Sequence, residues 1–75
     1  MKIKLELFGA SRDFSDNDHL ELNVKDQASV EDLRNEIIKY LDINFNDNEY
    51  FIKVVKSSAF FSEYNEILSD NYNIS

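Results

Sequence analysis

The sequence has no cysteine, no proline and no tryptophan, and only one glycine among its 75 residues. Without cysteine, no disulfide can stabilise the fold, and no thiol is available as a nucleophile. The single glycine, Gly9, cannot form a glycine-rich loop that cradles phosphate, and no serine lies in a Gly-x-Ser-x-Gly elbow. The residues give no support for self-contained catalysis, so we expect that the chain is not an enzyme and needs no cofactor.

Positively charged residues are scarce: 8 Lys and Arg stand against 15 Asp and Glu, for a net charge of -7. Nucleic-acid binding needs clustered Lys and Arg, and an anionic membrane surface repels an acidic protein. We therefore expect no nucleic-acid partner. The negative charge serves either solubility or steering toward a basic partner.

Long apolar segments are also missing, and no run approaches the roughly 20 residues of a membrane span. Met1 and Lys2 lead directly into an alternating segment, so we expect no signal peptide. These absences predict a soluble protein of the cytoplasm that has no membrane partner.

Metal ligands are few and poorly spaced. His19 is the only histidine, and without a second histidine or a cysteine it does not indicate a zinc site. Residues 42–47 resemble the start of a calcium loop, but Asp47 stands where that loop needs glycine and Lys53 where it needs glutamate. We expect no metal site.

One segment, residues 29–41, has a clear helical period. Ser29 stands at the N-cap position, where its hydroxyl can accept a backbone N–H; Asp32 is a weaker partner than the glutamate of a full capping box. The apolar residues of this segment share one face of a helix: Val30, Leu33, Ile37, Tyr40 and Leu41. This amphipathic helix needs an apolar surface against which to pack.

Two alternating segments before the helix predict strands. In residues 2–7, Ile3, Leu5 and Leu7 point one way, and in residues 19–25, Leu20, Leu22 and Val24 do the same. The connection contains a short helical turn at residues 10–14 and a polar turn at residues 15–18. The two strands should form a hairpin.

The second half of the chain is harder to divide. The helix should end near residues 41–42, followed by a loop at residues 43–48. Residues 50–56 are apolar and β-branched, and residues 59–62 are a second apolar run; one of them is the third strand, or both form one interrupted strand. Residues 65–68 connect to a turn, and residues 72–75 look like the beginning of a final strand.

The predicted order is β-β-α-β-(β), in which one main helix lies across one face of a mixed sheet. This arrangement is an α+β fold of the β-grasp, or ubiquitin-like, type, in a single domain of residues 1–75. We expect Leu33 and Ile37 to be buried between helix and sheet, beside the inward residues of both strands.

The chain also resembles a known family. The resemblance lies in the first strand running into Phe8-Gly9-x-x-Arg12-Asp13, in Ser29-Val30-x-x-Leu33 at the start of the helix, and in Ile67-Leu68-Ser69-Asp70-Asn71-Tyr72-Asn73-Ile74. These segments are similar to those of the β-grasp sulfur carriers, above all the small subunit of molybdopterin synthase (MoaD). The resemblance implies a carrier, without catalysis of its own, for molybdenum cofactor biosynthesis. Its partners would be a MoaE-like large subunit, to which it delivers sulfur for a cyclic pterin, and a ubiquitin-activating-type adenylating enzyme that uses ATP.

The sequence departs from that family at its end. The carriers end in a Pro-Pro-Val-Ser-Gly-Gly-like tail whose last glycine is adenylated and then thiocarboxylated, whereas this sequence stops at Ile74-Ser75. We expect that it is truncated before its last strand and tail, with Ile74 and Ser75 next to the missing tail, and that it is inert as given. The alternatives are a ubiquitin-like or RA-like binding module without carrier chemistry, and the thiamine-pathway carrier ThiS. The segment from Phe8 to Asp13 favours MoaD over ThiS.

A partner-binding face is predicted around exposed aromatic residues. Phe8 leaves its strand on the polar side, and Arg12 follows in the same loop. Phe60 and Phe61 are adjacent, so in an extended segment they point to opposite faces, and only one of them can join the core. Aromatic residues with arginine are typical interface anchors, so this face should bind MoaE or another copy of the chain. The alternative is that loops cover all three phenylalanines.

Overall fold

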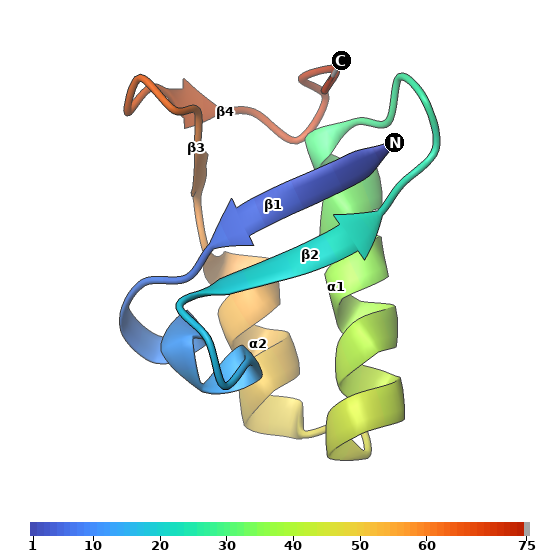
Figure 1. Cartoon of the computed structure of the whole chain (residues 1–75), viewed down its shortest axis with the longest axis vertical. Coiled ribbons are helices and arrows are strands. Elements are labelled where there is room, and N and C mark those ends of the chain that lie inside the picture. The colour runs from blue at the N-terminus through green and yellow to red at the C-terminus, as the bar shows by residue number, and fades with distance from the viewer. Residues whose placement is uncertain (75) are drawn as a thin grey trace.

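The computed structural model describes residues 1–74 and has an α+β fold with two antiparallel strand pairs (Figure 1). Its elements, in chain order, are β1 (Lys2–Glu6), the 3-10 helix η1 (Gly9–Phe14), β2 (His19–Asn23), α1 (Val30–Phe45), α2 (Glu49–Ser57), β3 (Phe60–Phe61) and β4 (Ile67–Leu68).

The predicted hairpin of β1 and β2 is confirmed, although both strands end slightly earlier than expected. Its register pairs Ile3 with Leu22 and Leu5 with Leu20, so the apolar side chains of both strands lie on one face. The expected helical turn in the connection is η1, which begins at Gly9 with a φ of 59°. That positive φ explains the glycine, because residues with a Cβ seldom adopt it.

The predicted N-terminus of α1 is confirmed in detail. Ser29 Oγ accepts the Asp32 backbone N–H at 3.1 Å, and the Ser29 backbone N–H donates to Asp32 Oδ2 at 3.0 Å. A full capping box therefore forms with aspartate in place of glutamate. The Ser29 backbone N–H is the main reason that the pKa of the Asp32 carboxyl lies below its usual value, because this bond favours the charged form.

Helix α1 continues to Phe45, so the expected loop at residues 43–48 was wrong for its first three residues. The helix ends where Asn46 takes a left-handed conformation, with a φ of 51°, which is a common helix C-cap. The extra turn brings the ring centroid of Phe45 to 5.2 Å from that of Phe51 in α2, with the rings edge to face. This contact joins the two helices at the end of α1.

Of the two apolar runs that could supply the third strand, residues 50–56 do not supply it, because this segment forms α2. Asn48 caps the helix, since its side-chain oxygen accepts the Phe51 backbone N–H at 3.2 Å. Phe51, Ile52 and Val55 fall at helical spacing, and all three pack in or against the core. The weak β preference of valine and isoleucine is therefore outweighed by the cap and by the helical face.

The third strand lies in the second apolar run, as β3. It pairs with β4 in a small antiparallel ladder of Phe60 with Leu68 and Phe61 with Ile67. The expectation for residues 65–68 missed β4. Of the predicted final strand, the described residues 72–74 contain a single bridge, between Asn73 and Ser29, and Ser75 lies outside the described residues.

Within residues 1–74, the strand pairs β1–β2 and β3–β4 form separate sheets. The expected single mixed sheet with one main helix is therefore not seen in this part of the chain, where α2 stands beside α1. Residues 50–56, one of the two segments expected to supply the third strand, are helical instead.

The core lies between the β1–β2 hairpin and the two helices (Figure 1). Leu33 and Ile37 of α1 are buried as predicted, and Ile3, Leu5 and Leu22 pack against this core from the hairpin. Phe14 of η1 and Val55 of α2 complete it. Neither helix of the described chain is long and apolar enough to cross a membrane.

Candidate functional site

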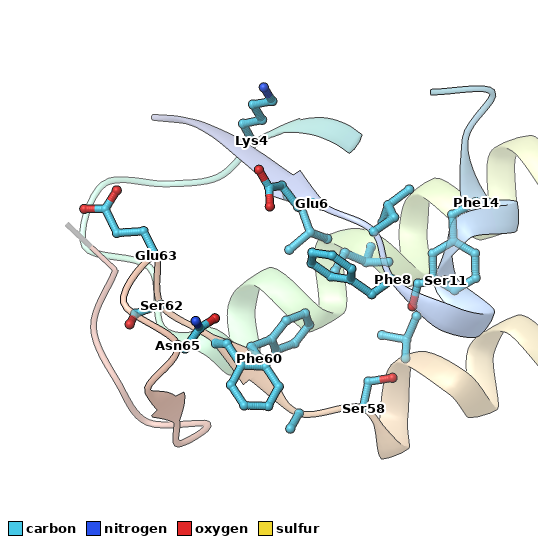
Figure 2. Close-up of a pocket in the computed structure, with 16 residues that line it drawn as sticks. Lys4, Glu6, Phe8, Ser11, Phe14, Ser58, Phe60, Ser62, Glu63 and Asn65 are labelled. Atoms are coloured by element: carbon cyan, nitrogen blue, oxygen red, sulfur yellow. The ribbon is translucent and has the colours of Figure 1, made fainter. Parts of the chain in front are cut away.

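A groove of about 840 Å³ separates β1 from the β3–β4 hairpin (Figure 2). One wall consists of residues 4–8, and the other of residues 58–63 with Asn65. Four buried core side chains contribute to its lining: Leu7, Phe14, Ile37 and Val55. The groove is therefore apolar at its base and polar at its rim, a composition typical of binding sites.

Three of the predicted anchors line this groove, Phe8 from one wall and Phe60 and Phe61 from the other. The exposed fraction of Phe8 is 74%, and that of Phe61 is 57%. The alternative that loops cover all three phenylalanines is therefore wrong for Phe8 and Phe61. Single exposed aromatics are common, but two of them on facing walls of one apolar groove form a surface suited to a partner.

The question of which phenylalanine joins the interior is also answered. Phe60 is half-buried, and the guanidinium of Arg34 lies over its ring at 4.7 Å from the ring centroid. Phe61 is exposed, so the two neighbours differ in burial as strand alternation predicts. The predicted division of this pair is confirmed, with Phe60 as the inner member.

Arg12 is exposed but does not line the main groove. It lies beside Phe8 in a neighbouring hollow of about 140 Å³, together with Glu6 and Asp18. The pKa of Asp18 is lowered, mainly by the hydrogen bond with His19 Nδ1 at 3.3 Å and to a smaller extent by the charge of Arg12. Phe8 therefore lies at the junction of both hollows, and Arg12 adds a positive charge at one end of the groove.

Arg34 of α1 supports the wall of the groove that residues 58–63 form. The sequence analysis did not identify this residue. Its side chain is only 13% exposed. The guanidinium donates hydrogen bonds to the carbonyl oxygens of Val55 and Ser58, the latter at 2.8 Å, and to Asp70 Oδ1 at 2.8 Å. Arg34 thus joins the end of α2, the start of β3 and the turn after β4.

The sequence contains only a weak signal for this role. Arg34 follows Leu33 and precedes Ile37 by three residues, so it borders the apolar face of the helix. Most arginines in that position extend into solvent over apolar neighbours. Only the position of α2, a segment that the sequence left open as a possible strand, explains why this arginine turns inward.

The last described residues are fixed at the start of α1. The Ile74 backbone N–H donates to the Ala28 carbonyl oxygen at 2.7 Å, and the backbone N–H groups of Val30 and Glu31 donate to the carbonyl oxygens of Tyr72 and Asp70. These bonds satisfy N–H groups that a helix leaves free in its first turn. Ile74 is half-buried, while its predicted neighbour Ser75 lies outside the described residues.

The polar groups that line the groove are spread along both walls. The polar lining consists of Lys4, Glu6 and Glu63 with hydroxyl and amide groups, all drawn from separate positions along the two walls. In the described part of the chain, no group of three histidine or acidic side chains is arranged to hold a metal ion.

Comparison of the chain with models of known families, with curated proteins and with solved structures finds no match.

Proposed function

We propose that the chain is a non-enzymatic protein-binding domain, and that the groove between β1 and β3 is its binding surface. The observation that supports this most is the placement of Phe8 and Phe61, both largely exposed, on facing walls of one apolar groove. Aromatic anchors at the centre of an apolar patch with a polar rim are the usual composition of a protein interface.

Photo-crosslinking tests this proposal. Benzoylphenylalanine is placed at position 8, 61 or 50 in otherwise identical chains. Tyr50 is the control, because it is 62% exposed but does not line the groove. We expect the same partner protein to be crosslinked from positions 8 and 61, identified by mass spectrometry, and not from position 50. Equal crosslinking from all three positions would mean that the groove is not the binding surface.

We also propose that the chain belongs to the β-grasp class in its finer topology. The capped helix that follows the β1–β2 hairpin and lies across it agrees with that topology, as does a later strand pair. Helix α2, at one of the two positions considered for the third strand, departs from it. The proposal therefore depends mainly on the first 45 residues.

A sulfur carrier of the MoaD type is the second candidate function, in the cytoplasm and with a MoaE-like large subunit and an adenylating enzyme as partners. One observation favours it. Residues 70–74 are held against the start of α1 by several backbone hydrogen bonds, so a tail attached beyond them would leave the domain from a fixed point. A carrier needs such a rigid domain, because the tail alone performs the chemistry.

The carrier proposal predicts that the 75-residue chain is inert, because the only glycine is Gly9. Incubation with a ubiquitin-activating-type enzyme, ATP and a sulfur donor should leave its mass unchanged. The control is the same chain with Pro-Pro-Val-Ser-Gly-Gly appended, which should gain the mass of a thiocarboxylate. A mass gain in the unextended chain, or no gain in the extended one, would contradict this candidate.

A further inference from the structure

The strand β1 has one unpaired edge. Met1 and Val24 exchange two backbone hydrogen bonds, each of 2.8 Å. Hydrogen-bonded and non-bonded pairs alternate along an antiparallel ladder. The register therefore points the backbone N–H and C=O groups of Lys2, Lys4 and Glu6 away from β2. Within residues 1–74 these groups have no backbone partner, and such an edge is a template for a further strand.

This edge opens into the groove. Lys4 and Glu6 both line it (Figure 2). The buried core side chains Phe14, Ile37 and Val55 line it as well. A strand added beside β1 would lie about 4.8 Å from it. Its side chains would point alternately toward the apolar base and toward solvent, so every second residue should be apolar.

The opposite wall is held in place without such a strand. Arg34 binds the Ser58 carbonyl oxygen and stacks on Phe60, and β3 makes its ladder with β4. The groove is therefore already formed before a partner arrives. A preformed site lowers the conformational entropy that the protein loses on binding.

The charge of the chain indicates the kind of strand. The net charge is -7; the lining of the groove contains Glu6 and Glu63 against Lys4, with Arg12 in the neighbouring hollow. A second copy would raise the net charge of the assembly to about -14, and like charges oppose association. A positively charged segment would be attracted.

We propose that the groove binds an extended, positively charged peptide segment of a partner protein, which adds to β1 as a strand and places alternate apolar residues over Phe14, Ile37 and Val55. This mode is β-strand addition, in which backbone bonds provide affinity and side-chain pockets provide selectivity. The inference rests on the proposed protein-binding function and names the partner chemistry for the same groove.

A synthetic peptide of alternating valine and lysine, about eight residues long to match a typical strand, is the probe. Amide hydrogen exchange of the 15N-labelled chain is followed by NMR with and without the peptide. We expect the Lys4 and Glu6 amides to exchange about tenfold more slowly with saturating peptide. The Glu21 and Asn23 amides are the internal control, because they face the free edge of β2, away from β1, and should not change.

Two matched comparisons separate strand addition from charge attraction alone. A peptide with glutamate in place of lysine should bind at least about tenfold more weakly. Phe61→Ala should weaken binding of the lysine peptide about tenfold, whereas Tyr64→Ala should leave it unchanged. Tyr64 is 77% exposed on the same hairpin and does not line the groove, so neither substitution should disturb the fold.

Three results would overturn the inference: no binding of the lysine peptide, binding without protection of Lys4 and Glu6, or equal binding of the glutamate peptide. Protection of these amides that rises with protein concentration in the absence of peptide would show that a second copy is the occupant instead. In any of these cases, a shared crosslinked partner at positions 8 and 61 would leave the proposed binding function standing. Loss of that shared partner would remove both.

Discussion

Phe14→Ala is expected to destabilise the fold by about 3–5 kcal/mol, the usual cost of removing a buried phenylalanine. Phe14 is 2% exposed, and its ring centroid lies 5.1 Å from that of Phe51 in α2. Its backbone carbonyl accepts a hydrogen bond of 2.6 Å from Tyr40 Oη of α1. Phe14 therefore holds η1 against both helices, and alanine would leave a cavity where the three elements meet.

Phe8→Ala is the matched control, because Phe8 belongs to the same connection but is 74% exposed. It should change the free energy of unfolding by less than about 0.5 kcal/mol. In a domain of this size, Phe14→Ala should lower the Tm by about 12 °C or more. Similar Tm values for the two variants, measured by circular dichroism, would contradict the position of Phe14 in the core.

The first half of the fold was predictable because its signals are local. The alternation of residues 2–7 and 19–25 and the cap at Ser29 each determine structure within a few residues of themselves. The inward residues Leu7, Leu20 and Val24 and the helix residues Leu33 and Ile37 are all in the core. Each local preference here agrees with the final packing.

The second half was less predictable because residues 50–56 have two conflicting signals. Their β-branched and aromatic side chains favour a strand, but Phe51, Ile52 and Val55 also fit one helical face. A short apolar run cannot be assigned by periodicity alone. The Asn48 cap, which lies two residues before that run, was the local signal that could have decided for a helix.

The candidate site was predictable for the exposed residues and not for the buried arginine. The phase of β1 places Phe8 on the polar side, and strand alternation separates Phe60 from Phe61, so both predictions needed only local geometry. The role of Arg34 depends on acceptors 21, 24 and 36 residues away in the chain. Such contacts cannot be read from the sequence until the position of α2 is known.

Arg34→Ala is expected to destabilise the fold by about 3 kcal/mol. Its guanidinium hydrogen bonds to the carbonyl oxygens of Val55 and Ser58 are part-buried. Removing the donor leaves both carbonyl oxygens without this hydrogen-bond partner. The ion pair with Asp70 adds less, because the Asp70 side chain is 58% exposed and exposed ion pairs contribute about 0–1 kcal/mol. Asp70→Ala should therefore cost at most about 1 kcal/mol.

Urea denaturation of four variants separates these contributions. Arg12→Ala is the matched control, since Arg12 is exposed, and it should stay within about 0.5 kcal/mol of the parent chain. Arg34→Lys should lie between the parent and Arg34→Ala, because an ammonium group retains the charge but cannot reproduce the planar fork of donors. If Asp70→Ala cost as much as Arg34→Ala, the ion pair rather than the two carbonyl bonds would hold β3 in place. The wall of the groove would then depend on an exposed contact, and raising the salt concentration should weaken it.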